Sequence, residues 1–348
     1  MRIEDEIKLT FDDVLIRPKR STLVSRSEVV LERQFKFKHT NEIWTGVPIF
    51  SANMDTTGTF ETAITLQKHK MLTAIHKFYS IKDWEQNVEK LDPNFISVTV
   101  GQSKEDLQLG QKIFSLNSDI KYLCIDVANG YREDFINSVK NYRETFPDKI
   151  IIAGNVATRE MTEALILAGA DIVKIGIGPG SVCTTRSVAG VGYPQLSSIS
   201  ECSDAAHGLG GHVMADGGCK YPGDVSKAFG AGADYVMLGG MFAGHKESGG
   251  ELVMDEEGVQ YKDFYGMSST KAQQTYYGDL AEHRAPEGKK VRLRYKGELD
   301  KTVQSILGGM RSACSYVGAK KLKDLPKSTT FIRVTQTTNE IFTGSENI

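Results

Sequence analysis

The chain has 348 residues, 25% of them charged, with a formal net charge of −2, which is an ordinary composition for a globular protein. The near-neutral charge gives no electrostatic reason to expect a nucleic acid or an anionic membrane as partner. No apolar run is long enough to cross a bilayer, and the first ten residues lack the apolar core of a signal peptide, so we expect a cytoplasmic protein. The five cysteines are scattered and include no CxxC pair, which disfavours a zinc site or a disulfide framework.

Short apolar segments rich in Val and Ile predict eight strands. They lie at 47–51, 72–76, 95–100, 122–127, 150–155, 172–177, 212–215 and 235–238. Such segments are typical of parallel strands that are covered on both faces. Apolar residues at helical spacing predict helices at 59–69, 103–116, 132–145, 158–167, 195–209 and 301–319. Strands that alternate with helices predict an α/β fold, a (β/α)₈ TIM barrel that forms a single catalytic domain over 1–348.

Two long segments exceed the roughly 250 residues that such a barrel needs. The first follows the sixth strand and contains Cys183, and the second, 244–295, follows the eighth strand. Residues 251–261 predict a hairpin around an Asp/Glu/Gly turn, and the polar remainder of the second segment predicts a mobile flap. Separately, Ala168–Asp171 and Ala231–Asp234 share the sequence Ala-Gly-Ala-Asp and predict two copies of one helix-to-strand turn, with glycine in a left-handed conformation.

Polar and glycine residues follow most of the predicted strands, at the end where barrels of this kind carry their active sites. After the seventh and eighth strands, the backbone N–H groups of four glycines are available to a phosphate: Gly217, Gly218, Gly239 and Gly240. Asp216 suits the two hydroxyls of a ribose. Together these residues predict a bound nucleoside monophosphate. The alternative is a set of tight turns that Asp216 caps.

The loop after the sixth strand, 176–186, presents Cys183 between glycines and small hydroxyl residues. A cysteine held in such a loop is a candidate nucleophile, although its thiol needs local help to ionise. The Thr185 hydroxyl can relay a proton, and the carbonyls of Gly178, Gly180 and Cys183 could surround a monovalent cation. The glycine spacing is wrong for a dinucleotide fingerprint. The alternative is a glycine-rich turn with an incidental cysteine.

Six motifs are recognisable: Leu9–Leu15, Ser51–Asp55, Gly176–Thr184, Asp216–Gly218, Leu238–Phe242 and Tyr265–Met267. Through them the chain resembles the inosine-monophosphate dehydrogenase and guanosine-monophosphate (GMP) reductase superfamily over nearly its whole length. Segments 17–22, 183–186, 266–269 and 311–314 are similar to the reductases. No CBS-type regulatory insertion interrupts the chain, and the flap lacks the Arg-Tyr pair of the dehydrogenases. Only Thr10–Asp13 is similar to the dehydrogenase version.

The resemblance implies that GMP is reduced by NADPH to IMP and ammonia in purine salvage, through a thioimidate on Cys183. It implies Thr185 and Glu287 as the proton-transfer pair. Besides Asp216 and the four glycines after the seventh and eighth strands, it implies substrate contacts at Gly266, Met267, Ser268, Arg284, Ala285, Pro286 and Gly288. It implies cofactor contacts at Ser25, Arg26, Lys77, Asp126, Val127, Ala128, Ile177, Gly178, Met267, Ser312, Ala313, Cys314 and Ser315. A potassium ion at Gly178, Gly180, Cys183 and Arg186 and a homotetramer are also implied.

Two other functions remain open at this point. The first is an IMP dehydrogenase without its regulatory domain, and the second is a barrel that binds purine nucleotides without catalysis. Without the resemblance, Arg26, Lys77 and Glu287 would be interpreted as solvated surface charges, and Asp126 as a structural residue at a strand end.

Overall fold

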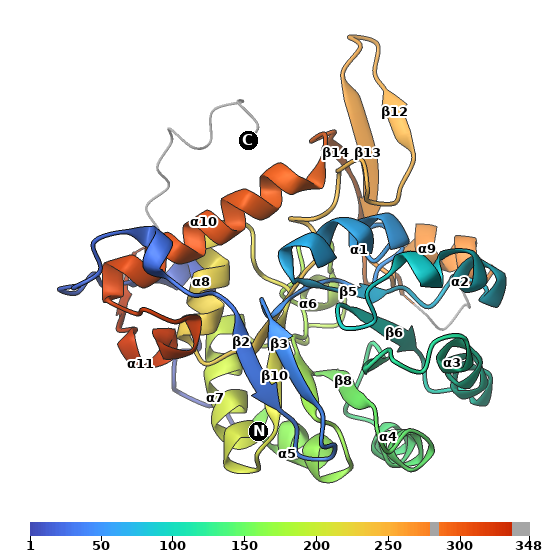
Figure 1. The fold of residues 1–348 in the computed structure, drawn as a ribbon, viewed down its shortest axis with the longest axis horizontal. Helices are drawn as coiled ribbons and strands as arrows, with labels where there is room; N and C mark the ends of the chain where they lie inside the picture. Colours follow the sequence, from blue (N-terminus) through green and yellow to red (C-terminus); the bar gives the residue numbers. More distant parts are fainter. Residues whose placement is uncertain (279–284, 336–348) are drawn as a thin grey trace.

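Eight parallel strands close into a barrel in the computed structural model of the chain, which describes residues 1–278 and 285–335 (Figure 1). The barrel strands are β4 (Ile49–Ser51), β5 (Leu72–Ile75), β6 (Ile96–Val100), β7 (Tyr122–Asp126), β8 (Ile150–Val156), β9 (Ile172–Ile175), β10 (His212–Asp216) and β11 (Tyr235–Leu238). Strand β11 pairs in parallel with β4, which completes the circle. The predicted (β/α)₈ barrel is therefore confirmed, with each strand end within about two residues of its predicted position.

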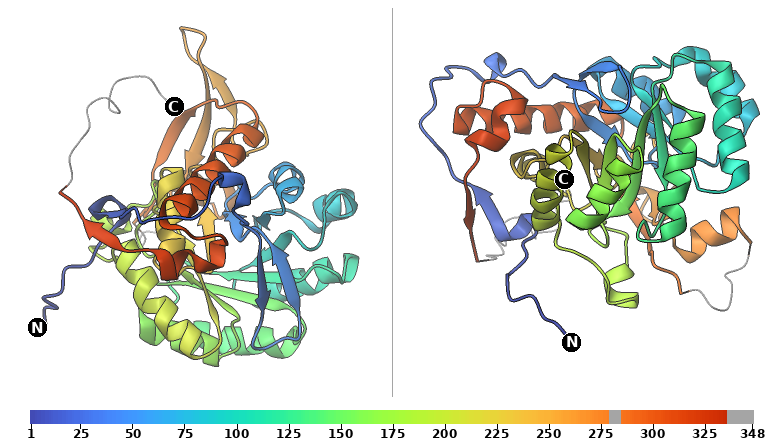
Figure 2. Two further views of the ribbon diagram at one scale, coloured as in Figure 1. Left: turned by 60° about the vertical axis from the view of Figure 1, so that its left-hand side comes forward. Right: turned by 90° about the horizontal axis from the view of Figure 1, so that it is seen from below.

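Helices surround the barrel strands (Figures 1 and 2). They are α1 (Phe60–Leu66), α2 (Ile81–Asn87), α3 (Lys104–Leu116), α4 (Glu133–Thr145), α5 (Arg159–Leu167), α7 (Gln195–Gly208), α8 (Pro222–Gly230) and α10 (Leu299–Val317). The six predicted helices are present. The prediction missed α2 and α8, because α2 is short and buries a single residue, Trp84, while α8 opens on a Pro-Gly pair that hides its periodicity.

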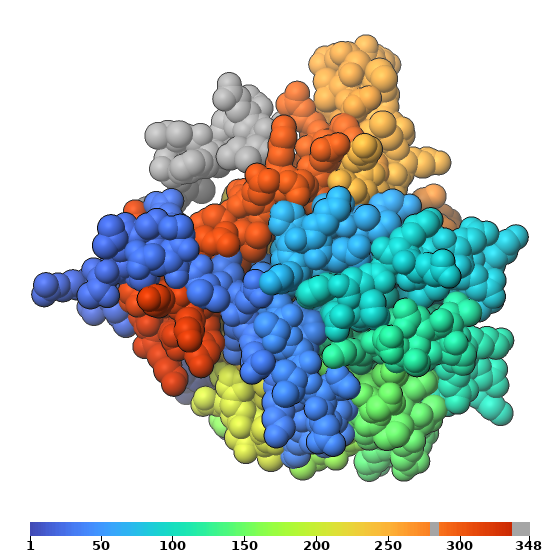
Figure 3. All heavy atoms as spheres, in the orientation of Figure 1, coloured from blue at the N-terminus to red at the C-terminus, as the bar shows by residue number. Residues whose placement is uncertain are grey.

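An antiparallel hairpin closes the amino end of the barrel. It consists of β2 (Arg33–Lys36) and β3 (Ile43–Gly46), and Figure 3 shows it, in blue, on the near face of the molecule. Phe35 and Trp44 from the hairpin pack on Tyr235 inside the barrel, with ring centroids 4.5 and 5.8 Å from the tyrosine. Because this aromatic cluster fills the amino end, a ligand must enter at the carboxyl end of the strands.

The two Ala-Gly-Ala-Asp segments form the same turn, as predicted. Gly169 and Gly232 have φ angles of 117° and 111°. In each turn the aspartate carboxylate accepts a hydrogen bond from a strand N–H, which Ile151 donates to Asp171 at 3.0 Å and Val213 donates to Asp234 at 3.1 Å. Each aspartate also forms a salt bridge with an arginine. The repeated sequence therefore ties two helix-to-strand turns to the amino end of the barrel.

The Asp234 carboxylate also gives the fold a pH dependence. Its Oδ2 lies 2.7 Å from Nε2 of the half-buried His207. This hydrogen bond raises the pKa of His207, against the opposing effect of burial. Because the pKa is higher in the folded chain than in the unfolded chain, the imidazolium stabilises the fold fully below the unfolded pKa of about 6.5. That stabilisation is lost as the pH rises through the folded pKa.

We expect His207→Gln to lower the free energy of unfolding by about 0.5–1 kcal/mol in acid, a modest amount because the imidazole is partly exposed. Urea unfolding of both proteins at about pH 5.5 and about pH 8.5, on either side of the ordinary histidine pKa, measures the difference. The deficit should shrink at the higher pH. An equal deficit at both pH values would contradict the assigned role of the charged pair.

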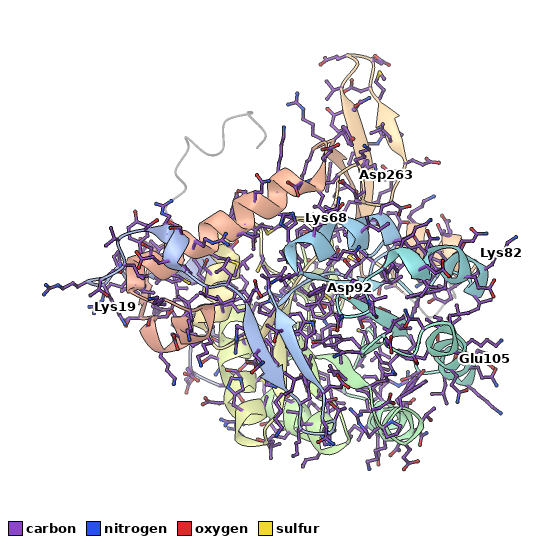
Figure 4. The ribbon with its side chains drawn as sticks, in the orientation of Figure 1. Lys19, Lys68, Lys82, Asp92, Glu105 and Asp263 are labelled. Carbon is purple, nitrogen blue, oxygen red and sulfur yellow. The ribbon has the colours of Figure 1, made fainter. Side chains whose placement is uncertain are left out.

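The segment after β11 adds a three-stranded antiparallel sheet. Strands β12 (Leu252–Met254) and β13 (Gln260–Tyr265) form the predicted hairpin, and β14 (Lys290–Arg294) pairs with β13. Asp263, labelled in Figure 4, joins these strands through Lys290 Nζ at 2.5 Å. The remainder of the segment was predicted to be a mobile flap, but its described part contains β14 and the helix α9 (Thr270–Tyr276). Cross-strand pairing supplies order that hydrophobic periodicity does not reveal.

In the part of the chain that the structure describes, no helix has both the length and the hydropathy needed to span a bilayer.

Candidate active site

The loop that carries Cys183 lies over the carboxyl ends of β9 and β10. It begins at Gly176, where a Cβ atom would lie 2.1 Å from the carbonyl oxygen of Asp216, and it continues through Gly178, which has a φ of 82°. The first position has no room for a side chain, and the second needs a left-handed backbone. The loop ends in the short helix α6 (Thr185–Val188). The glycines therefore let the backbone pass close to the neighbouring strand and present Cys183.

A line of hydrogen bonds joins the three predicted catalytic side chains. Cys183 Sγ lies 3.2 Å from Thr185 Oγ1, and that hydroxyl donates to Glu287 Oε2 at 2.7 Å. All three residues are partly buried. A thiol, a hydroxyl and a carboxylate in this order can move a proton between the carboxylate and a group that reacts at the sulfur. Glu287 is distant in sequence, so the fold alone brings it here.

Backbone hydrogen bonds hold this arrangement. Thr184 N donates to the carbonyl of Glu287 at 3.0 Å, and Lys289 N donates to that of Val182 at 2.9 Å. The segment around Glu287 therefore lies beside the cysteine loop as a short antiparallel bridge. Because these two backbone hydrogen bonds hold the main chain around Glu287 against the cysteine loop, the position of the Glu287 carboxylate is fixed by the backbone as well as by its bond to Thr185.

The other cysteines are poor candidates for a nucleophile. Burial raises the pKa of Cys124 to about 12 and of Cys202 and Cys314 to about 11. Burial also raises the pKa of Cys219. All five cysteines are unpaired. A thiol with a raised pKa is inert at neutral pH, so Cys183 remains the candidate.

Predicted substrate residues from the loop after β13 also lie against the cysteine loop. A Cβ on Gly266 would lie 3.0 Å from the carbonyl oxygen of Val182 and 3.1 Å from Cα of Gly288. Glu287 N donates to the carbonyl of Ser268 at 3.1 Å. Met267 lies between these contacts in sequence, and Ala285 and Pro286 are exposed just before Glu287. Arg284 lies outside the described residues.

The glycine turns predicted to bind phosphate lie on the other side of the same loop. Gly217 and Gly218 have φ angles of 87° and 91°. A Cβ on Gly217 would lie 3.2 Å from the backbone nitrogen of Gly180, and one on Gly240 would lie 3.0 Å from Oγ of Ser181. Gly239 precedes Gly240 at the end of β11. The turns after β10 and β11 therefore meet the cysteine loop, as an active site shared between them requires.

Sequence reasoning missed a charged residue at the centre of this end of the barrel. Lys174 on β9 is buried, and its Nζ contacts Asp126 Oδ1 at 2.6 Å and Asp216 Oδ2 at 2.9 Å. Burial is the largest single influence and would raise the pKa of Asp126, but the charge and hydrogen bond of Lys174, together with the charge of Lys77, hold that pKa below its usual range. A single lysine inside an apolar strand is the signal that could have revealed it.

The predicted cofactor residues fall into two separate groups. The first lies at the carboxyl end of the barrel, where Val127 N donates to the carbonyl of Gly154 and the charge of Lys77 acts on Asp126. Its other members are Ala128, Ile177 and Gly178.

The second group contains Ser25 and Arg26, on the 3₁₀ turn η2 (Arg26–Glu28), which packs against α10. The C-terminal part of α10 supplies Ser312, Ala313, Cys314 and Ser315. Figure 2 shows this part of the molecule on the opposite side from α6. Cys314 is fully buried in the core, so its side chain does not face a ligand within this chain. The fold of one chain therefore does not unite the two groups.

The carbonyls predicted to bind potassium pass a simple chemical test in part. Among the described residues, no backbone N–H from a turn, loop or helix cap donates to the carbonyl of Gly178, Cys183 or Arg186. The carbonyl of Gly180, by contrast, accepts a hydrogen bond from Cys183 N at 3.1 Å. A carbonyl without a donor needs another partner. Three of the four residues thus fit an oxygen-liganded monovalent cation.

These observations define a TIM barrel whose candidate active site is built around Cys183. The IMP dehydrogenase / GMP reductase domain family matches residues 8–341, and the chain belongs to that family. The GMP reductase of Buchnera aphidicola subsp. Acyrthosiphon pisum (strain Tuc7) is 58% identical over 345 residues, which cover 98% of this chain and 99% of the relative. The GMP reductase of Escherichia coli O81 (strain ED1a) is 57% identical with the same coverage. The resemblance inferred from the motifs is confirmed, and the protein is an oxidoreductase.

Proposed function

We propose that this protein reduces GMP to IMP and ammonia with NADPH, through a covalent bond between Cys183 and carbon 2 of the purine. The observation that carries the proposal is the line of hydrogen bonds from Cys183 through Thr185 to Glu287. Replacing an amino group by hydrogen needs a nucleophile, a proton donor for the leaving nitrogen and a hydride. The first two are present as side chains, and NADPH, when bound, supplies the hydride.

In the proposed reaction, the Cys183 thiolate attacks carbon 2 and the bond from carbon 2 to the amino nitrogen breaks. Thr185, which is held by Glu287, passes a proton to that nitrogen, so that ammonia and not an amide anion leaves. The substrate is then a thioimidate on Cys183. When a hydride reaches carbon 2, the carbon–sulfur bond breaks, IMP leaves and the thiolate is restored. Carbon 2 is reduced, and the nicotinamide is oxidised.

The contacts around Cys183 favour a nucleoside monophosphate as substrate. Backbone N–H groups of the turns Gly217–Gly218 and Gly239–Gly240 would hold the phosphate, and the Asp216 carboxylate would accept hydrogen bonds from the ribose hydroxyls. The loop of Gly266, Met267 and Ser268 and the segment from Arg284 to Gly288 would contact the phosphate and the base. Both glycine turns adjoin the cysteine loop, so such a substrate would lie beside Cys183.

NADPH would bind along the first group of cofactor residues, with Lys77 near its phosphates. The second group, around Arg26 and the end of α10, lies on the other side of the molecule from the cysteine loop (Figure 2). We propose a homotetramer in which this second group completes the cofactor site of a neighbouring protomer. A potassium ion at the carbonyls of Gly178, Cys183 and Arg186 would brace the cysteine loop. The proposed reaction belongs to purine salvage in the cytoplasm.

We expect Glu287→Gln to lower kcat by about 10²–10⁴-fold, the usual contribution of a proton-transfer group. The amide keeps the shape of the side chain but cannot carry the proton. The affinity for GMP, measured by equilibrium titration, should change little. Glu257→Gln is the matched control, because Glu257 is exposed in the turn between β12 and β13. Parallel losses of kcat and affinity would assign Glu287 to binding.

The competing functions predict different products. An IMP dehydrogenase would form NADH from IMP and NAD⁺, and a non-catalytic barrel would bind purine nucleotides without turnover. Tyr276, a tyrosine of the flap, stacks on Phe78 with ring centroids 3.6 Å apart, and its hydroxyl donates to Asp55 at 2.6 Å. Both its ring and its hydroxyl are therefore engaged in contacts within the chain. Loss of NADPH absorbance that requires GMP and matches the ammonia formed distinguishes the three functions.

A further inference from the structure

One buried lysine joins the substrate half and the cofactor half of the proposed site. The Lys174 side chain is only 3% exposed, and its ammonium contacts the carboxylates of Asp126 and Asp216. Burying a charged group costs several kcal/mol unless its partners are well placed. An apolar residue would fill the same position in a barrel strand at lower cost. The position therefore calls for an explanation beyond packing.

The barrel register explains how one lysine reaches two strands. Asp126 on β7 pairs with Gly154 on β8, and Gly154 pairs with Lys174 on β9. A Cβ on Gly154 would lie 2.6 Å from Cβ of Lys174 and 2.5 Å from its carbonyl oxygen. Because Gly154 has no side chain, the lysine can extend across β8 to Asp126. On its other side, β9 pairs with β10, which ends at Asp216.

The hydrogen bonds leave each carboxylate a surface for a ligand. Within the described residues, Lys174 and Asn155 donate to the Asp216 carboxylate, and both bond Oδ2, at 2.9 and 2.8 Å. The Asp216 side chain remains 20% exposed and that of Asp126 26% exposed. Since the amino end of the barrel is filled, this exposed surface belongs to the open end.

We infer that Lys174 is a positioning residue that sets the Asp126 and Asp216 carboxylates in a fixed geometry, so that binding of the nucleotide substrate and binding of the nicotinamide cofactor are coupled through it. This inference rests on the proposed function for the identity of the two ligands. It assigns Lys174 no contact with either ligand. Its effect is transmitted through the two aspartates.

The charges around Lys174 account for this coupling. Besides the two aspartates, the titratable groups that act on it or on Asp126 are Cys124, whose thiol stays neutral through burial, and Lys77. If Lys174 lost its charge, two carboxylates would face each other in a poorly solvated space with Lys77 as the remaining cation. Like charges disfavour ionisation, so the pKa of one carboxylate would rise. A protonated carboxyl would then rotate to donate its own hydrogen bond, and the ligand geometry would be lost.

The test replaces Lys174 by methionine, which has similar length and no charge. We expect KM for both GMP and NADPH to rise and kcat/KM to fall by about 10²-fold, the size of effect that small misplacements of binding groups produce. The acid limb of the pH profile of kcat/KM should move to higher pH by about one pH unit. Lys149→Met is the matched control, because Lys149 is also buried and bonds Ser118 and Asp148 away from the carboxyl end.

A purely structural role would give a different result. Lys174→Met would then resemble Lys149→Met, with a lower melting temperature but an unmoved acid limb and unchanged KM values, and the inference would be wrong. If the methionine variant does not fold, Lys174→Gln keeps one donor without the charge and should shift the acid limb in the same direction. If neither folds, Asp126→Asn decides: it should weaken GMP binding as well as NADPH binding, and unaltered GMP binding would overturn the coupling.

The same experiment separates this inference from the proposed function. If the wild-type protein does not oxidise NADPH with GMP, the proposed function fails. Equilibrium titration with GMP and with NADPH across pH then still tests Lys174, because binding needs no turnover. Weaker binding of both ligands to Lys174→Met, with an acid limb at higher pH, supports the coupling, and binding equal to wild type overturns it.

Discussion

Replacing Cys183 by alanine is expected to abolish GMP-dependent oxidation of NADPH, with a loss of at least about 10⁴-fold in kcat. The reason is that the proposed covalent bond needs the Cys183 thiol. In the described part of the chain, Thr185 Oγ1 bonds both Cys183 Sγ and Glu287, so it is suited to moving a proton, and the other cysteines have raised pKa values. Stopped assays for ammonia and IMP, alongside NADPH absorbance, measure the loss.

GMP should still bind to Cys183→Ala, because the phosphate turns and Asp216 are unchanged. A titration that shows affinity within about threefold of wild type separates chemistry from binding. Glu257→Gln again serves as the control, since Glu257 is exposed in the turn between β12 and β13 and takes no part in the line of hydrogen bonds. Retained turnover in Cys183→Ala would falsify the covalent mechanism.

Replacing Asp171 by alanine is expected to lower the free energy of unfolding by about 3–5 kcal/mol. The carboxylate is fully buried and contacts Arg143 Nη2 at 2.5 Å. It also accepts hydrogen bonds from the backbone nitrogens of Ile151 at 3.0 Å and His39 at 3.1 Å. Removing it leaves a largely buried guanidinium and two amides without their acceptor, which costs far more than an exposed ion pair.

Urea unfolding followed by circular dichroism measures this effect. Asp148→Ala is the comparison, because the Asp148 side chain is 70% exposed, and its substitution should change the free energy by no more than about 0.5 kcal/mol. If the two variants lost equal stability, the Asp171 turn would not anchor the amino end of the barrel as its contacts indicate.

The local sequence was sufficient to predict the barrel, and it singled out Cys183 as the candidate nucleophile. Strands such as β8 begin with an unbroken apolar run, Ile150–Ala153, so burial on both faces leaves parallel pairing as the natural solution. The Ala-Gly-Ala-Asp repeats predicted both turns, because a glycine with positive φ and a polar residue at a strand start are local requirements. By contrast, β14 and α9 were hidden, since their order comes from pairing and docking with distant segments.

The site divides in the same way. The glycine loop with Cys183, the turns after β10 and β11 and Asp216 follow from sequence, because strand-end chemistry in a barrel is a local property that the fold class sends to one end. That Glu287 reaches Thr185, and that Lys174 joins Asp126 to Asp216, depends on contacts between residues far apart in the chain. Such contacts form only when the eight strands pair in register to close the barrel, and when the segment that contains Glu287 packs over the carboxyl end of the strands. The sequence by itself determined which groups are present, and the tertiary structure decided which of them share protons and charges.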